Sequence, residues 1–99
     1  MHYTTERFWK YYNALPESVQ QTADQCYELL KADKSHPSLH FKKLGNKYWS
    51  VRAGLNYRAL GVEVENGISW FWIGTHTEYD KLIGKLRFIH LNTPVCVPG

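Results

Sequence analysis

The sequence predicts an α+β fold, in which an N-terminal helical hairpin packs on a small antiparallel sheet and a short C-terminal helix follows the last strand. Three observations lead to this prediction. Apolar residues recur every three or four positions in the first third of the chain, the period then shifts towards two, and residues 68–74 are almost continuously apolar. These patterns are typical of amphipathic helices, of half-buried strands and of a central strand covered on both faces.

The N-terminal third is predicted to form two helices joined by a proline turn. Thr4 or Thr5 is a suitable N-cap, and Pro16 ends the first helix and begins the second. Apolar residues at helical spacing give each helix one apolar face. These faces consist of Phe8, Tyr11, Tyr12 and Leu15 in the first helix and of Val19, Ala23, Cys26, Tyr27 and Leu30 in the second.

A loop at Asp33–Ser38 leads into the predicted meander. Turn signals at Gly45-Asn46, Gly54–Asn56 and Asn66-Gly67 separate its strands, and helices are expected to leave one sheet face open. Arg52 is expected on that open face, whereas Arg58 reaches it only through a bulge or an edge position. The expected strands are Leu39–Leu44, Tyr48–Ala53, Tyr57–Val64 and 68–74, with a short helix near Glu78–Leu82; residues 1–83 form the domain and 84–99 a tail of uncertain structure.

The composition indicates a single domain whose core needs neither disulfides nor a metal. The chain has 99 residues and only two cysteines, Cys26 and Cys96, which do not have metal-ligand spacing. No apolar stretch approaches the length needed to span a membrane. We therefore expect a cytoplasmic protein without membrane contact, cofactor or metal site.

Positive charge is concentrated in the middle of the chain. Residues 34–61 contain six Lys or Arg and no acidic residue, and Tyr48, Trp49 and Tyr57 are interleaved with them. Basic and aromatic side chains together suit an RNA backbone and unstacked bases. A sheet face solvated by lysines is the plainer alternative, and the absence of acids favours the polyanion interpretation.

The end of the apolar run is a second candidate site. After Gly74 the chain presents His76, Tyr79 and Asp80, so a rigid strand delivers an imidazole, a phenol and a carboxylate at its exit. The alternative is that His76 only caps the strand and Tyr79 closes the core. Trp70, Trp72 and His76 have the same parity, which does not decide which tryptophan faces the helices.

Four segments together resemble the RelE/ParE superfamily of bacterial type II toxins: HPSL at 36–39, SVR at 50–52, YRALG at 57–61 and WIGTHTEYDKL at 72–82. GTH and HP-x-L are especially similar to the YafQ-like branch. The resemblance covers roughly residues 5–82. The chain departs from the family in its tail, and its N-terminus is too short for a full first strand before the helices.

The resemblance implies a ribosome-dependent mRNA endoribonuclease that needs no metal and is neutralised by a cognate antitoxin. It implies that His76 is the general acid, that His36 is a base or phosphate ligand, and that Tyr79 stacks on or orients a base. Arg52 replaces a histidine of that branch and cannot be a general base, because guanidinium stays protonated. Arg58 matches a phosphate-binding arginine and Ser50 replaces a carboxylate; the remaining predicted RNA contacts are Lys42, Lys43, Lys47 and His40.

Two other functions within the superfamily stay open at this point. One is a ParE-like poison of DNA gyrase, which needs no acid or base, and the other is an inactive relative that binds an antitoxin. His76 and His36 together with the basic block favour the ribonuclease. A homodimer or a toxin–antitoxin hetero-oligomer is compatible with each function.

Overall fold

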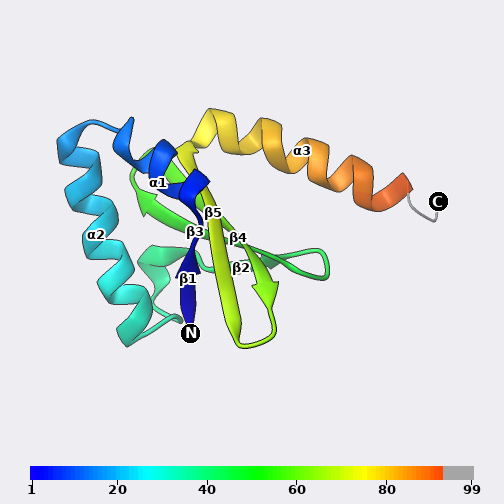
Figure 1. Cartoon of the computed structure of the whole chain (residues 1–99), viewed down its shortest axis with the longest axis horizontal. Coiled ribbons are helices and arrows are strands. Elements are labelled where there is room, and N and C mark those ends of the chain that lie inside the picture. Colours follow the sequence, from blue (N-terminus) through cyan, green and yellow to red (C-terminus); the bar gives the residue numbers. More distant parts are fainter. Residues whose placement is uncertain (93–99) are drawn as a thin grey trace.

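The chain folds into a five-stranded sheet with helices on both faces (Figure 1). The structure is a computed structural model that describes residues 1–92, with side chains described for residues 1–85. No helix in this part of the chain is long and apolar enough to cross a membrane. The elements are β1 (His2–Thr4), α1 (Glu6–Asn13), α2 (Glu17–Ala32), the 3₁₀ turn η1 (Pro37–Leu39), β2 (Lys42–Leu44), β3 (Tyr48–Gly54), β4 (Tyr57–Val64), β5 (Gly67–Thr75) and α3 (His76–Asn92).

The α+β class is confirmed, but the sheet is mixed rather than antiparallel. Its strand order is β1-β5-β4-β3-β2, and β1 runs parallel to β5. The N-terminus was expected to be too short for a full first strand, and it forms a short strand of three residues. Without β1, one edge of β5 would have unpaired backbone groups, and even three residues can pair with it. Ile68 N–H also donates to the carbonyl of Met1 at 3.0 Å.

The two N-terminal helices lie on one face of the sheet. The Thr5 side chain caps α1 by accepting from Phe8 N–H at 3.1 Å, which selects one of the two predicted caps. α1 packs on β5 and α2 packs on β3, so the predicted hairpin is present only as two consecutive helices that follow a strand. The core on this face includes Leu30, Leu39 and Trp70.

A β-bulge separates the two central tryptophans. The β4–β5 register pairs Gly61 with Trp70 but Leu60 with Trp72, so β5 has one extra residue between them. An extra residue reverses the side-chain alternation. Trp70 accordingly joins the core under α1 and α2, whereas Trp72 packs with Leu60 and Tyr79 on the opposite face.

The C-terminal helix is longer than predicted. α3 begins directly after β5 and crosses the expected boundary between residues 83 and 84. No proline lies between Thr75 and Asn92, and Gly84 alone weakens a helix by only about 1 kcal/mol. The first turns of α3 cover part of the second sheet face, and the helix then projects away from the sheet (Figure 1). The last part of the predicted tail, residues 93–99, lies outside the described residues.

Candidate functional site

Arg58 is a buried cation on the sheet face that α3 partly covers. It lies on β4 opposite Gly74 of β5 and Arg52 of β3, and only 7% of it is exposed. Its Nη1–H donates a long hydrogen bond of 3.4 Å to Ser50 Oγ, and its Nε has no partner. The predicted bulge lies between Arg52 and Gly54, but Arg58 reaches this face because it shares the side of Leu60, which faces α3 rather than α1 and α2.

The positive charge of Arg58 has no acidic partner among the described side chains. Its guanidinium carbon lies 5.2 Å from the centroid of the Tyr79 ring. The Tyr79 hydroxyl is also buried without a hydrogen-bond partner. A buried charge without a counter-ion is costly, so a site that retains one is a candidate for binding an anion.

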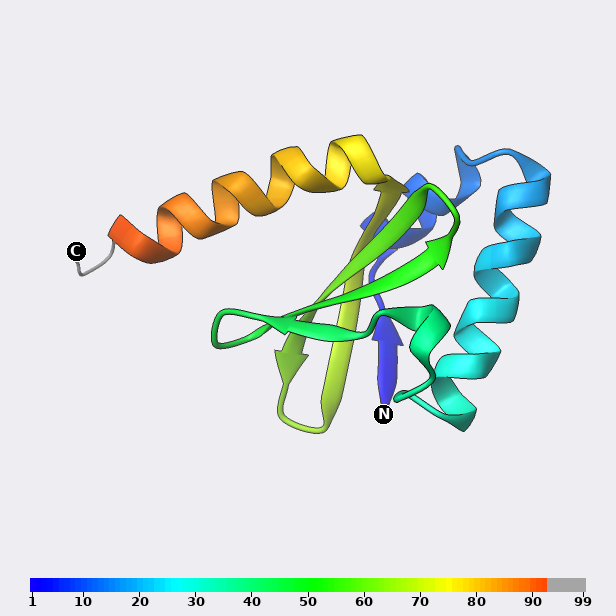
Figure 2. The same cartoon turned by 180° about the vertical axis from the view of Figure 1, so that it is seen from behind.

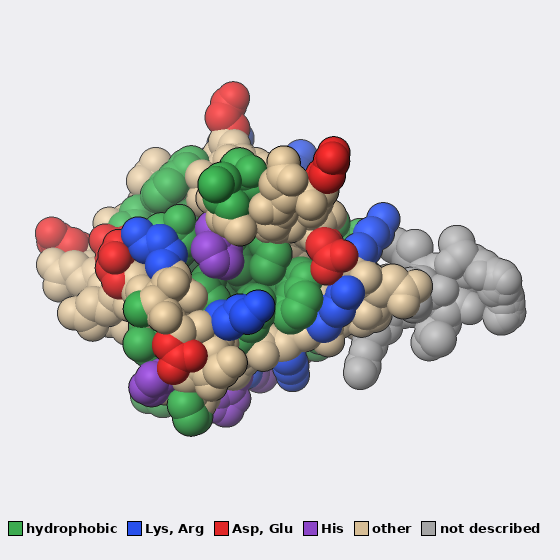
Figure 3. Space-filling view, turned by 90° about the horizontal axis from the view of Figure 1, so that it is seen from below, with side chains coloured by type: hydrophobic (Ala, Val, Ile, Leu, Met, Phe, Trp, Pro, Cys, Tyr) green, Lys and Arg blue, Asp and Glu red, His purple; other side chains and the backbone are tan. Residues whose placement is uncertain are grey.

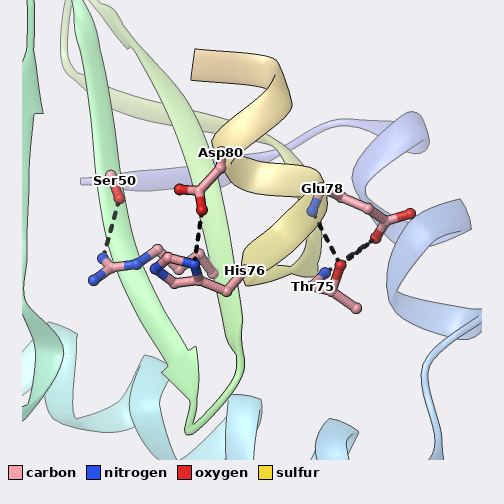
Figure 4. A network of polar contacts seen from close by, with 6 residues as sticks. Ser50, Thr75, His76, Glu78 and Asp80 are labelled. Carbon is pink, nitrogen blue, oxygen red and sulfur yellow. Dashed lines mark hydrogen bonds and ion pairs between the residues drawn. The ribbon is translucent and has the colours of Figure 1, made fainter. Parts of the chain in front are cut away.

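His76 is held at the start of α3 and, like Arg58, lies near the Tyr79 ring. Its backbone N–H donates to the carbonyl of Asn56 at 2.7 Å. Its ring is half exposed, lies 5.7 Å from the Tyr79 ring between centroids, and places Nδ1 3.2 Å from Asp80 Oδ2 (Figure 4). The cluster therefore combines a fixed positive charge, an imidazole that can transfer a proton and a carboxylate that contacts the imidazole.

Two predicted RNA contacts are buried within this cluster. Tyr79 is only 2% exposed and packs with Leu60 and Trp72, so little of its ring is open to a base in this structure. Ser50 is 0% exposed, and its hydroxyl accepts from Arg58 instead of facing solvent. Both roles stay predictions from the resemblance. In the structure the Tyr79 ring lies 5.2 Å from the Arg58 guanidinium carbon, and Ser50 accepts the hydrogen bond from that guanidinium.

The other predicted histidines lie outside the cluster. His36 caps η1, where its Nδ1 lies 3.2 Å from Ser38 N and 2.8 Å from Ser38 Oγ. His40 ends that turn with φ +46° and is exposed. η1 packs on α2 and β3, and it lies apart from the first turn of α3 (Figure 2). No described hydrogen bond or ion pair joins either histidine to His76.

The basic block is divided between the two faces of the sheet. Lys42 pairs with Ser50 and Lys43 with Trp49, and neighbours in sequence point to opposite faces of a strand. Lys43 Nζ lies 3.2 Å from Glu63 Oε1. Hydrogen bonds from Trp49 and Lys43 lower the pKa of Glu63. An acid outside the block in sequence thus neutralises part of it in space. Figure 3 likewise shows acidic side chains interspersed with basic ones over one face of the molecule.

Arg52 has a different environment from Arg58. β2 stops pairing after Ser50, so Arg52 lies on an edge segment of β3. It lines a cavity of about 170 Å³ between the sheet and the two N-terminal helices, whose other walls are largely aromatic and aliphatic. Burial raises the pKa of the Cys26 thiol in that wall, and the positive charge of Arg52 opposes this increase. Neither His76 nor Arg58 lines the cavity, so it is separate from the cluster.

Two residues of the site lacked an assigned role at the sequence level. Asp80 stood out as a polar residue, and its spacing of four from His76 is the signal that places both on one helix face. Tyr48 lies on the same side of β3 as Ser50, is half-buried, and has Lys47 Nζ 5.6 Å from its ring centroid. No group of three or more metal-binding side chains gathers in the described part of the chain.

Several solved toxin structures have the same fold. A chain of the RelB–RelE antitoxin–toxin complex from Methanococcus jannaschii matches with a TM-score of 0.63 and 17% identity, over 81% of this chain and 96% of that chain. The RelE–RelB complex from Pyrococcus horikoshii OT3 matches at 0.61 and 13%, over 76% and 92%. The isolated Escherichia coli RelE toxin matches at 0.56 and 11%, over 87% and 97%. At these identities the similarity shows the fold alone.

Sequence comparison supplies the family. The search of curated proteins gives no match. The family model described as the ParE-like toxin domain matches residues 17–81, from the start of α2 to the first turns of α3, which is more than half of the chain. The chain therefore belongs to the ParE-like toxin domain family, within the RelE/ParE superfamily of toxins.

Proposed function

We propose that this toxin is an endoribonuclease that cleaves mRNA on the ribosome. The observation that supports the proposal most directly is the nine-tenths buried Arg58, which lacks a carboxylate partner among the described side chains and lies over the ring that His76 also faces. A phosphodiester supplies the anion that such a site lacks, and the half-exposed His76 imidazole is accessible to it. A gyrase poison requires no imidazole at this position.

The proposed reaction is an attack of the RNA 2′-hydroxyl on the adjacent phosphate. The 2′-oxygen forms a bond to phosphorus, the bond from phosphorus to the 5′-oxygen breaks, and a 2′,3′-cyclic phosphate and a 5′-hydroxyl result. Arg58 stabilises the negative charge that develops on the phosphoryl oxygens. His76 donates a proton to the departing 5′-oxygen, and solvent water accepts the proton of the 2′-hydroxyl.

The rest of the basic face is proposed to hold the RNA strand. By register, Lys42 lies beside Ser50 on the face of Arg58. Tyr48 begins β3, and Lys47 lies in the turn just before it. Tyr48 is proposed to stack on a base, because it is half-buried whereas little of Tyr79 is exposed. Lys43 contributes less, because Glu63 already pairs with it.

We further propose that an antitoxin neutralises the protein. Two of the structures that share the fold are complexes of a RelE toxin with a RelB antitoxin. An antitoxin that covers the Arg58 and His76 face would exclude RNA, and extended or helical segments commonly bind in this way. The cytoplasm, where ribosomes translate mRNA, is the proposed site of action.

The test is to map new RNA 5′ ends across the transcriptome shortly after induction. Wild-type toxin should produce in-frame cuts that require translation, and His76→Ala should reduce their rate by about 10²–10⁴-fold. His36→Ala is the matched control, because the described hydrogen bonds of this exposed side chain are to Ser38 alone, and it should cleave at nearly the wild-type rate. Growth arrest without new ends would replace the ribonuclease with a gyrase poison. Equal losses in the two variants would refute the assignment of the acid.

A further inference from the structure

The backbone around His76 is fixed by a capping box. Thr75 N–H donates to Glu78 Oε1 at 3.1 Å, and Glu78 N–H donates to Thr75 Oγ1 at 3.2 Å. This reciprocal pair satisfies donors that the start of a helix leaves free. The bond from His76 N–H to Asn56 O ties the same turn to the β3–β4 connection. The position of the His76 Cα atom and the direction of its Cβ are therefore set by the main chain.

The imidazole ring itself is not fixed by these backbone contacts. The side chain of His76 is 51% exposed, and rotation about its two side-chain torsions would turn either nitrogen towards solvent. Its aromatic neighbour, Tyr79, lies at a tilted 53° between ring planes and offers no hydrogen bond to it. Glu78, the other carboxylate of this turn, is engaged by Thr75 (Figure 4).

Asp80 supplies the missing constraint. It lies one helical turn after His76, on the same face of α3, with Oδ2 3.2 Å from Nδ1 of the imidazole (Figure 4). A proton on Nδ1 that is donated to this carboxylate fixes the ring and its tautomer. It leaves Nε2, the other nitrogen, free to face a substrate. A negative charge near the start of α3 also suits the positive end of the helix.

We propose that Asp80 is a positioning residue that holds His76 with Nδ1 protonated and Nε2 directed towards the RNA. This role rests on the proposed ribonuclease function. In the protonated ring, the Nε2–H bond breaks as its proton moves to the 5′-oxygen, and the bond between that oxygen and phosphorus breaks. The neutral ring that remains keeps its Nδ1–H donated to Asp80, so one tautomer alone is formed.

The expected effect on cleavage is moderate. A buried aspartate that orients a catalytic histidine contributes about 10⁴-fold in serine proteases. The pair of His76 and Asp80 is half exposed, and solvent weakens such contacts. Asp80→Ala should therefore slow single-turnover cleavage of ribosome-bound mRNA by about tenfold. Asp80→Asn should also slow cleavage, because its amide can donate to Nδ1 and so favour the other tautomer. The exposed Glu65→Gln, which also removes one negative charge, should lose nothing.

A double-mutant cycle separates positioning from a general structural effect. In the His76→Ala background, Asp80→Ala should cause no further loss, because it acts only through the imidazole. If the fold-loss in cleavage rate of the double variant equals the product of the two single-variant losses, the proposal is overturned. A circular-dichroism melt of each variant identifies any that fails to fold, and Asp80→Asn then takes its place in the cycle.

A measurement that needs no RNA tests the same contact. Nitrogen-15 NMR of the imidazole, with His76→Gln used to assign its signals, reports which nitrogen carries the proton in the neutral ring. Nδ1 should be protonated in the wild type, and its share should fall in Asp80→Ala but not in Glu65→Gln. An unchanged tautomer in Asp80→Ala would refute the positioning role. If the tautomer responds but the wild type cuts no RNA, the contact stands and the ribonuclease proposal fails.

Discussion

Replacing Arg58 with methionine tests whether this arginine serves to bind an anion or to stabilise the fold. Methionine fills a similar volume and packs against Leu60, Trp72 and Tyr79 without introducing a charge. If the role of the guanidinium is to bind a phosphate, its removal should stabilise the free protein and abolish RNA cleavage. If it holds the sheet to α3, its removal should destabilise the fold.

The magnitude follows from the partners of Arg58. Burial of an ion costs several kcal/mol, or about 4 kcal/mol for a group this deep. The cation–π contact with the Tyr79 ring stabilises the buried charge by at most about 2 kcal/mol. The hydrogen bond to Ser50, which is long at 3.4 Å, contributes about 1 kcal/mol. The difference predicts that Arg58→Met stabilises the protein by about 1 kcal/mol, before any gain from apolar packing. In a domain of this size that raises the melting temperature by about 4–8 °C.

Thermal melts with and without inorganic phosphate provide the assay. A ligand that binds the native state at about ten times its Kd stabilises that state by roughly 1.4 kcal/mol, so phosphate should raise the melting temperature of the wild type and leave Arg58→Met unchanged. Arg52→Met is the matched control, since Arg52 is opposite Arg58 in register but half-buried at an edge. A lower melting temperature for Arg58→Met, with an unchanged response to phosphate, would refute this reasoning.

Two further predictions concern stability. Burial, assisted by the N-terminus, Lys31 and Lys34, lowers the pKa of His2 in the folded state, and the unfolded value is 6.5. Protonation of His2 therefore does not affect the free energy of unfolding above pH 6.5, and it lowers that free energy as the pH drops below 6.5. The melting temperature of the wild type should fall more between pH 7.5 and 5.5 than that of His2→Gln, and an equal fall would contradict this. At Gly61 a Cβ would lie 2.5 Å from Ile68 Cγ2 and 2.8 Å from Trp70, so Gly61→Ala should cost about 1–3 kcal/mol in urea unfolding. At Gly84 a Cβ meets nothing within 4 Å, so Gly84→Ala should stabilise α3 by up to about 1 kcal/mol, and the opposite order of the two glycine variants would be evidence against these contacts.

Local sequence patterns were sufficient to predict most elements. The helical periods of α1 and α2, the Thr5 cap and the turns at Gly45-Asn46 and Asn66-Gly67 depend on neighbours within a few residues. The position of β1 does not, because three residues form a strand only when the edge of β5 is available, and β5 lies more than sixty residues later. The length of α3 was underestimated because the predicted tail was judged from its apolar residues, whereas no proline interrupts the chain between Thr75 and Asn92.

The orientation of the site residues depended on one bulge that the sequence does not mark. Parity along β5 placed Trp70 and Trp72 on one face, and the extra residue between them puts them on opposite faces. The second core formed in this way buries Tyr79, which the family resemblance had given a role in stacking on RNA. Strand alternation predicts which side chains lie together only between irregularities, and active sites are where such irregularities concentrate.

The basic side chains of residues 34–61 are neighbours in the sequence but do not form one positive surface in the structure. The segment 34–61 is uniformly basic in sequence, yet Glu63 neutralises Lys43 and Arg52 lies at a separate cavity. What remains for a phosphate is chiefly Arg58, with the Lys42 and Lys47 side chains further along the same sheet face. The basic block therefore indicates a polyanion partner only in general terms. The one arginine that is buried without an acidic partner among the described side chains is where we propose that a phosphate binds. Salt dependence of RNA binding should accordingly reflect a few phosphate contacts rather than all six positive charges.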